Sequence, residues 1–258
     1  MDHTAQLQRI TTKLAAARKA DSDLKVFGAT HHQYRINPPA SEQDVLAFEQ
    51  RYSIQLPACY RAFITSVGNG GTSFDAAAAG PFYGIFLLGE NLNELVQRPE
   101  LFLSQPAILQ PEMTSEEWAA QIKRLNEDGT PDQEYEEELG RIYSGILPIG
   151  SQGCSSLHAL VLNGPHAGKV VNLNTDRDKP KFAFEQNFLD WYERWLDEVI
   201  SGYLSRNDTV WFGYAKPADS AQPAPPAASP QTTPAPHESP HSTPRESFLA
   251  KLLKRFTR

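Results

Sequence analysis

The hydrophobic positions between residues 41 and 71 repeat at intervals of three and four, which predicts two consecutive helices. Ser41 is a typical N-cap, and Asp44 stands where a carboxylate can bond back to it. Leu56-Pro57 begins the second helix, since proline lacks an N–H that the first turn would leave unpaired. The run Gly68-Asn69-Gly70-Gly71 ends it with residues that tolerate positive φ.

Similar patterns predict further helices along the chain. An N-terminal helix is marked by an apolar stripe at Leu7, Ile10, Leu14 and Ala17. Residues 91–103 predict a short helix broken at Pro99, and Thr114 with Glu117 forms a capping box before another helix. Residues 188–200 predict a helix whose large aromatic side chains form a core stripe.

Strands are predicted where short apolar runs lie between turn residues. Residues 82–88 are short, aromatic and apolar, and predict a buried strand. Three more are predicted at 145–149, 157–162 and 169–174, with a hairpin loop at 163–168. The predicted fold class is therefore α+β, with a mixed or antiparallel sheet and helices against one face.

The last 42 residues differ in composition from the rest. Pro-rich sequence begins at Pro217 and predicts an extended, disordered linker. Thr243-Pro244-Arg245-Glu246 then caps a predicted amphipathic helix. Its apolar arc comprises Phe248, Leu249, Leu252, Leu253 and Phe256. Its basic side comprises Lys251, Lys254 and Arg255. Such a helix could dock on the acidic body, lie on a membrane surface or enter a partner's groove.

Charge and cysteine content narrow the function classes. The formal net charge is -7, and the predicted tail is slightly basic, so residues 1–216 form an acidic body. That body suits a basic protein partner and does not suit direct nucleic-acid binding, which needs Lys and Arg at phosphates. The cysteines number only two, and no signal peptide or apolar run long enough for a membrane span is found, which predicts a cytoplasmic protein.

Three stretches in this order resemble the SUKH superfamily, the group typified by fungal cell-wall assembly regulators and many bacterial immunity proteins. The first is carried by Glu49, Leu56, Pro57, Tyr60, Phe63, Gly68, Asn69, Gly70 and Gly71. The second runs over residues 146–150, Gly153, 160–164 and 168–171, and the third over 182–184 and 188–192, including Trp191. The resemblance implies structural roles for these residues and spans about residues 36–200.

With this resemblance, the predicted organisation has four parts: an N-terminal helix and connection (1–35), a SUKH-like domain (36–216), a disordered linker (217–243) and a basic amphipathic helix (244–258). The resemblance implies a non-enzymatic immunity protein that neutralises a toxin, often a nuclease, by covering its active site. The alternative is a regulatory or scaffold protein of a cell-wall or envelope complex, localised by its C-terminal helix and peripheral to the membrane.

An acidic stretch is the first candidate site. It comprises Glu127, Asp128, Asp132, Glu134, Glu136, Glu137 and Glu138. It could be a solvated acidic loop, or a docking surface that speeds association with a basic partner. A calcium loop is rejected, because the alternate-residue ligand spacing is missing.

Catalytic and cofactor chemistry is weakly indicated. The histidines lack zinc-binding spacing, and Cys59 lies in an apolar helix as a structural thiol. Cys154 lies in a Gly/Ser-rich segment where a nearby His could activate it, but the resemblance assigns that segment to a turn. The sequence therefore predicts no enzyme, no metal site and no cofactor.

Overall fold

The structure is a computed structural model that describes residues 2–71, 77–206 and 212–213. All of these belong to one compact unit, Met1–Lys216. The predicted linker and terminal helix, 217–243 and 244–258, lie outside the described residues. Among the described residues, no helix has both the length and the apolar character to cross a membrane.

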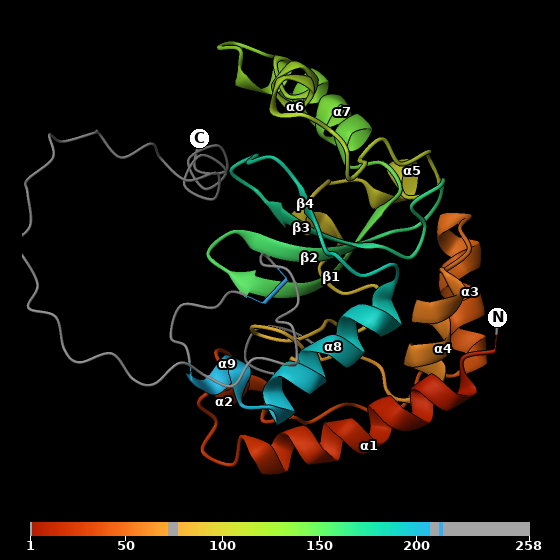
Figure 1. Cartoon of the computed structure of the whole chain (residues 1–258). Helices are drawn as coiled ribbons and strands as arrows, with labels where there is room; N and C mark the ends of the chain where they lie inside the picture. The colour runs from red at the N-terminus through yellow and green to blue at the C-terminus, as the bar shows by residue number, and fades with distance from the viewer. Residues whose placement is uncertain (1, 72–76, 207–211, 214–258) are drawn as a thin grey trace, which may run out of the picture. The chain divides into compact units, whose positions relative to one another are not determined.

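A four-stranded antiparallel sheet forms the centre of the fold (Figure 1). Its order is β1-β2-β3-β4, with β1 at Ile146–Gly153, β2 at Ser156–Val161, β3 at Val170–Asn174 and β4 at Lys181–Phe182. The three strands predicted in this region are confirmed, as is the hairpin between β2 and β3, and with them the α+β class. The two-residue β4 was not predicted.

A tight turn joins β1 to β2. Strand β1 continues to Gly153, beyond its predicted end at residue 149. Cys154 and Ser155 form this turn with φ of 46° and 70°. Positive φ at both central residues is typical of the hairpin turns that match strand twist. Cys154 is exposed at its tip.

Helices cover both faces of the sheet, so the prediction of one covered face is wrong. On one face, Leu147, Ile149, Leu160 and Val170 pack into a core with α1 (Thr4–Ala20), α3 (Glu42–Tyr52), α4 (Ala58–Ser66) and α8 (Phe188–Ile200). On the other, Ile146, Ala159, Val161 and Val171 pack with α6 (Ser115–Gln121), η3 (Arg124–Asn126) and α7 (Asp132–Ile142). Figure 1 shows α8 and α6–α7 on opposite sides of the strands. Strands that are apolar on both faces need this double cover.

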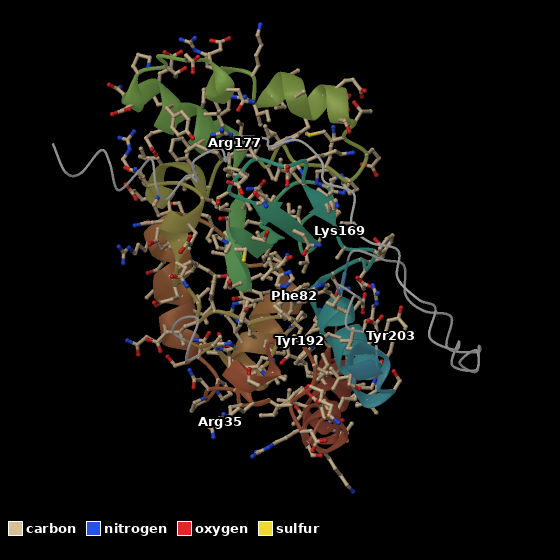
Figure 2. All side chains as sticks on the ribbon, turned by 90° about the vertical axis from the view of Figure 1, so that its left-hand side faces the viewer. Arg35, Phe82, Lys169, Arg177, Tyr192 and Tyr203 are labelled. Atoms are coloured by element: carbon tan, nitrogen blue, oxygen red, sulfur yellow. The ribbon has the colours of Figure 1, made fainter. Side chains whose placement is uncertain are left out.

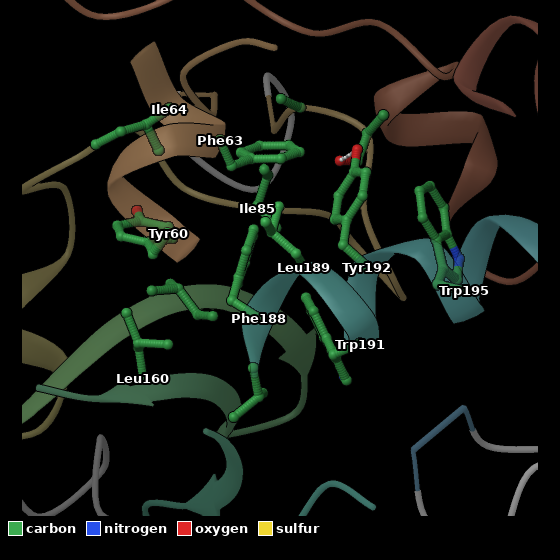
Figure 3. Packing of buried hydrophobic residues seen from close by; sticks show 14 of the residues in the cluster. Tyr60, Phe63, Ile64, Ile85, Leu160, Phe188, Leu189, Trp191, Tyr192 and Trp195 are labelled. Carbon is green, nitrogen blue, oxygen red and sulfur yellow. Dashed lines mark hydrogen bonds between the residues drawn. The ribbon is translucent and has the colours of Figure 1, made fainter. Parts of the chain in front are cut away.

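Helix α8 fills the core on the first of these two faces, the first core, while the core beneath α6 and α7 is the second core. The bounds of α8 are those predicted from the sequence. Asn187 caps it by accepting hydrogen bonds from the N–H groups of Leu189 and Asp190, at 2.9 and 3.2 Å. Figure 3 shows Phe188 and Tyr192 turned towards Phe63 of α4, whereas Trp195 lies farther along the helix. Tyr192 packs 4.6 Å from Phe63, ring centre to ring centre, and its hydroxyl donates to the carbonyl of Ala79 at 2.7 Å.

Helix α1 packs along α8, which confirms the predicted N-terminal helix. Three residues of its apolar stripe, Ile10, Leu14 and Ala17, are buried and Leu7 is partly buried, and its polar edge meets the Glu193 carboxylate of α8. Burial alone would raise the pKa of Glu193, but hydrogen bonds from Arg9, Lys13 and Gln6 outweigh it and lower that pKa to about 2. The ion pairs measure 2.8 Å to Arg9 and 3.0 Å to Lys13.

The segment 82–88 is buried as predicted but is not a continuous strand. Phe82 and Gly84 have φ of 55° and 94°, which interrupts an extended backbone. Its residues make isolated bridges instead, among them Ile85 with Gly150 at the free edge of β1. The segment therefore covers that edge of the sheet.

Short helices complete the described chain. They are α2 (Ala29–His32), η2 (Leu92–Glu94), α5 (Pro99–Phe102) and α9 (Tyr203–Arg206). The predicted break at Pro99 is confirmed, because η2 ends before it and α5 begins at it. The capping box of Thr114 and Glu117 at the start of α6 is confirmed in both of its hydrogen bonds.

Candidate protein-binding surface

The acidic stretch lies on the outer helical layer, and most of it is helical. Asp132 and the glutamates at 134, 136, 137 and 138 belong to α7, while Glu127 and Asp128 precede it. The interpretation as a solvated acidic loop is therefore wrong for the helical part. Together these seven residues form the acidic surface.

Helix α7 forms because its few apolar residues share one side. Tyr135, Leu139 and Ile142 recur at intervals of four and three, and the last two are buried in the second core. Asp132 and Glu134 in the first turn favour the positive end of the helix. Since the inner side is apolar, Asp132 and Glu137 are exposed on the outer side, while Glu134, Glu136 and Glu138 are partly buried at its edges.

Two arginines partly neutralise the acidic surface. Arg124 forms a two-pronged ion pair with Glu134, at 2.6 and 2.9 Å, and also contacts Glu127. The hydrogen bond from Arg124 lowers the pKa of Glu134. Arg141 pairs with Glu138 at 2.9 Å and also donates to Gln121. These exposed pairs relieve the repulsion between neighbouring carboxylates, but because water screens them they add little to stability.

Other carboxylates in the surface keep their charge uncompensated. Asp128 and Glu137 are exposed, and among the described residues neither has a Lys or Arg within 4.0 Å. Gln133 donates a neutral hydrogen bond to Glu137 at 2.9 Å. These two carboxylates are available to a cationic partner without first breaking an ion pair.

The net charge of the whole chain is concentrated on this layer. Residues 115–141 contain nine Asp or Glu against three Lys or Arg, a balance of -6. The formal net charge of the chain is -7, so all other residues together carry only -1. Residues 217–258, outside the described residues, hold five Lys or Arg against three Asp or Glu, so the rest of residues 1–216 carries -3 and two thirds of the negative charge of this unit lies on one side of the sheet.

A residue that the sequence did not single out supports the layer from below. Arg177 follows β3, and its carbonyl accepts a hydrogen bond from the Trp118 indole of α6 at 2.9 Å. Its guanidinium donates to the Tyr135 hydroxyl of α7 at 2.7 Å. Figure 2 shows Arg177 beneath these helices. A single loop residue thus joins both helices to the sheet, which gives the acidic surface a fixed position.

A model of the SMI1 / KNR4 family (SUKH-1) matches residues 39–194, more than half of the chain. The chain belongs to this family. The match confirms the resemblance and extends from α3 across the sheet and the acidic layer into α8. No curated protein matches the chain. SUKH domains are commonly protein-interaction modules, and membership suggests an immunity or regulatory role.

The residues that carry the SUKH-1 likeness hold the first core together. The Glu49 carboxylate accepts a hydrogen bond from the N–H of Leu56 at 2.8 Å, just before α4, for which Pro57 is the N-cap. Tyr60 and Phe63 are buried on α4 against Phe188. In the structure, the contacts of these residues thus lie within and beside the first core.

The glycines after α4 have a different role from the one predicted. Neither Gly68 nor Gly70 has positive φ. Instead, a Cβ at Gly70 would lie 1.8 Å from the carbonyl oxygen of Phe86, and one at Gly68 would lie 2.5 Å from that of Asn37. The Asn69 side chain accepts hydrogen bonds from the N–H groups of Gly70 and Leu88, at 3.0 and 2.9 Å. Glycine is required here for close approach of backbones.

The remaining sequence candidates are dispersed over the SUKH-1 domain. Cys59 is buried, and burial raises the pKa of its thiol. Cys154 occupies the exposed β1–β2 turn, and Gly153 lies under the Tyr83 ring. Within residues 2–71, 77–206 and 212–213, no group of three or more His, Cys, Asp or Glu side chains could hold a metal ion. The apolar and basic residues proposed for the tail lie outside the described residues.

Proposed function

We propose that this chain is a non-enzymatic immunity protein that neutralises a basic, nuclease-like toxin by occluding its active site. The observation that carries the proposal is the concentration of net charge on the α6–α7 layer of a SUKH-1 domain. A nuclease must attract phosphate, so its active site is lined with cationic groups. A fixed carboxylate surface can occupy those groups in place of the substrate.

The electrostatics of the acidic surface favour recognition of such a partner. A charge balance of -6 on one layer produces a field that accelerates encounter with a basic surface. The Debye length at physiological ionic strength is about 8 Å, so the effect depends on salt. Once the partner is bound, the proposed mechanism is steric and electrostatic, and the immunity protein carries out no chemical step.

The acidic surface offers a direct test by charge neutralisation. Asp128→Asn with Glu137→Gln removes the two exposed carboxylates that have no ion pair. The matched control is Asp23→Asn with Asp197→Asn, which changes the net charge equally on the α1–α8 side, where each has an exposed ion pair. A partner is first captured from native cells with the unaltered protein and purified, and its affinity for each form is then measured by calorimetry.

The proposal predicts selective weakening in the acidic-surface variant. Two exposed charges at an interface contribute roughly 0.2–1 kcal/mol each, so affinity should fall about 2- to 30-fold at low salt. The control variant should bind like the unaltered protein. Equal affinities for both variants would exclude the acidic surface as the binding site.

A further inference from the structure

Three pairs of an Asn or Asp followed by Gly occur in the sequence, and the structure surrounds them differently. They are Asn69-Gly70, Asp128-Gly129 and Asn163-Gly164. In such a pair, the glycine nitrogen can attack the side-chain carbonyl carbon of the preceding residue, because glycine has no side chain to obstruct the approach. The attack closes a succinimide ring. Whether the ring forms depends on the freedom of the side chain and of the glycine nitrogen.

Hydrogen bonds hold the side chains of both asparagines. Asn163 Oδ1 accepts from the N–H of Ala107 at 2.8 Å, and its Nδ2 donates to the carbonyl of Gln105 at 2.9 Å. Asn69 Oδ1 accepts from the N–H groups of Leu88 and of the glycine that follows it, at 2.9 and 3.0 Å. Two hydrogen bonds must therefore break before either asparagine can turn into the geometry of attack.

The side chain of Asp128 is not held in this way. It is exposed in the connection that leads into α7, at the outer helical layer (Figure 1). Within the part of the chain that the structure describes, no hydrogen bond or ion pair joins the Asp128 carboxylate or the Gly129 N–H to another protein group. Gly129 has a φ of 81°, and a Cβ added there would have nothing within 4 Å. The backbone at this pair can therefore rotate without losing a contact.

We infer that Asp128 isomerises spontaneously to isoaspartate in the folded protein, whereas Asn69 and Asn163 are protected from the corresponding deamidation. In the first step, the Gly129 nitrogen bonds to Cγ of protonated Asp128, and the carboxyl OH leaves as water together with the N–H proton. In the second step, a water molecule adds to the main-chain carbonyl carbon of Asp128. The bond from that carbon to the Gly129 nitrogen breaks, and the nitrogen takes a proton from the water. Water is the only co-reactant, and the mass of the chain is unchanged.

Isomerisation changes the position of a carboxylate in the acidic surface without changing the net charge. In isoaspartate the main chain runs through Cβ and Cγ, so it is one carbon longer. The former main-chain carbonyl becomes the free carboxylate, attached directly to Cα. If the acidic surface binds the partner, ageing of the protein should therefore weaken binding. This consequence rests on the proposed function, whereas the isomerisation does not.

Isoaspartate formation is measured in the full-length protein, kept near neutral pH at constant temperature. Mass spectrometry with electron-transfer fragmentation distinguishes the two isomers by their backbone fragments. A synthetic peptide of residues 124–133 gives the reference rate without the fold. Asp128 should convert in the protein at a rate within about threefold of that in the peptide, since an exposed loop opens at almost no cost. A rate more than about tenfold below the peptide rate would overturn the inference.

Asp128→Asn provides a comparison of identical chemistry, because all three pairs are then Asn-Gly. Deamidation at position 128 should be roughly 5- to 150-fold faster than at Asn69 and Asn163, the factor expected when two ordinary hydrogen bonds need not break first. Equal rates at the three positions would overturn the inference. The calorimetry with Asp128→Asn therefore uses freshly prepared protein, before deamidation restores the carboxylate.

Asp128→Glu separates the isomerisation from its consequence. Glutamate keeps the charge but would have to close a larger, six-membered ring, so position 128 should stay unconverted during storage. Affinity for the captured partner should fall on ageing in the unaltered protein and stay constant in Asp128→Glu. Conversion of Asp128 with unchanged affinity would leave the isomerisation established and count against the acidic surface as the binding site.

Discussion

Two buried histidines make the stability of the fold sensitive to mild acid. His32 of α2 and His158 of β2 are 1% and 0% exposed. His32 Nδ1 accepts a hydrogen bond from the N–H of Tyr34 at 3.0 Å, and its ring packs 5.8 Å from that of Trp195. Burial lowers the pKa of each to about 4, with a smaller contribution from His31 at His32.

The sign and size of the effect follow from proton binding. Below pH 6.5 the unfolded chain takes up protons at these residues, whereas the folded protein keeps both rings neutral until about pH 4. Stability is therefore complete above pH 6.5 and is lost as the pH falls towards 4. At about pH 5 the loss is about 2 kcal/mol per histidine, or about 4 kcal/mol for both, a large share of a typical 5–15 kcal/mol.

Urea unfolding at about pH 7 and pH 5 measures this loss directly. His158→Gln and His32→Gln should each remove about half of the difference between the two pH values, whatever they cost at pH 7. Gln8→Ala, at an exposed position of α1, alters no titratable side chain, so it is the control and should leave the difference unchanged. If the unaltered protein loses less than about 1 kcal/mol between the two pH values, the reasoning from burial is refuted.

Three further predictions concern the close approach at Gly70, the hydrogen bond of Glu49 and the segment 217–258. Gly70→Ala should destabilise the protein by more than about 3 kcal/mol in chemical unfolding, because the added Cβ would meet a backbone carbonyl. The control Gly164→Ala should cost about 1 kcal/mol from its positive φ alone, because nothing lies within 4 Å of the added Cβ. Equal costs for the two variants would contradict this reasoning. Glu49→Gln should cost about 1–2 kcal/mol by weakening the charged hydrogen bond to the Leu56 N–H, and an unchanged midpoint would exclude that role. Deleting residues 217–258 should leave the thermal midpoint of the remaining chain and partner neutralisation intact; loss of neutralisation or of cellular localisation would favour the scaffold alternative.

The regular spacing of apolar residues was sufficient to predict the helices that face the first core. The helices at 4–20, 42–52 and 188–200 present several large apolar residues at regular spacing, so their faces could be recognised without the structure. Helix α7 was missed because its dense glutamates obscured a short apolar set at Tyr135, Leu139 and Ile142. That spacing was the signal that could have identified it.

Tertiary contacts account for what the sequence could not reveal. The cover on the second face of the sheet could not be predicted, because helix α7, which packs on the apolar residues of that face, was not predicted. The close approach at Gly70 depends on a segment some 16 residues away, and the pairing of His158 with Asn172 depends on strand register. The acidic surface was identified by composition, but its ion pairs with Arg124 and its support by Arg177 were not.

The most direct measurement is protection against the purified partner that the chain captures from its native cells. The partner is produced in cells together with the unaltered protein, with Asp128→Asn/Glu137→Gln, or with the control Asp23→Asn/Asp197→Asn. Survival with the unaltered protein and the control, and reduced survival with the acidic-surface variant, is the predicted result. A partner that is harmless to the cells, or equal survival with both variants, would contradict neutralisation by the acidic surface.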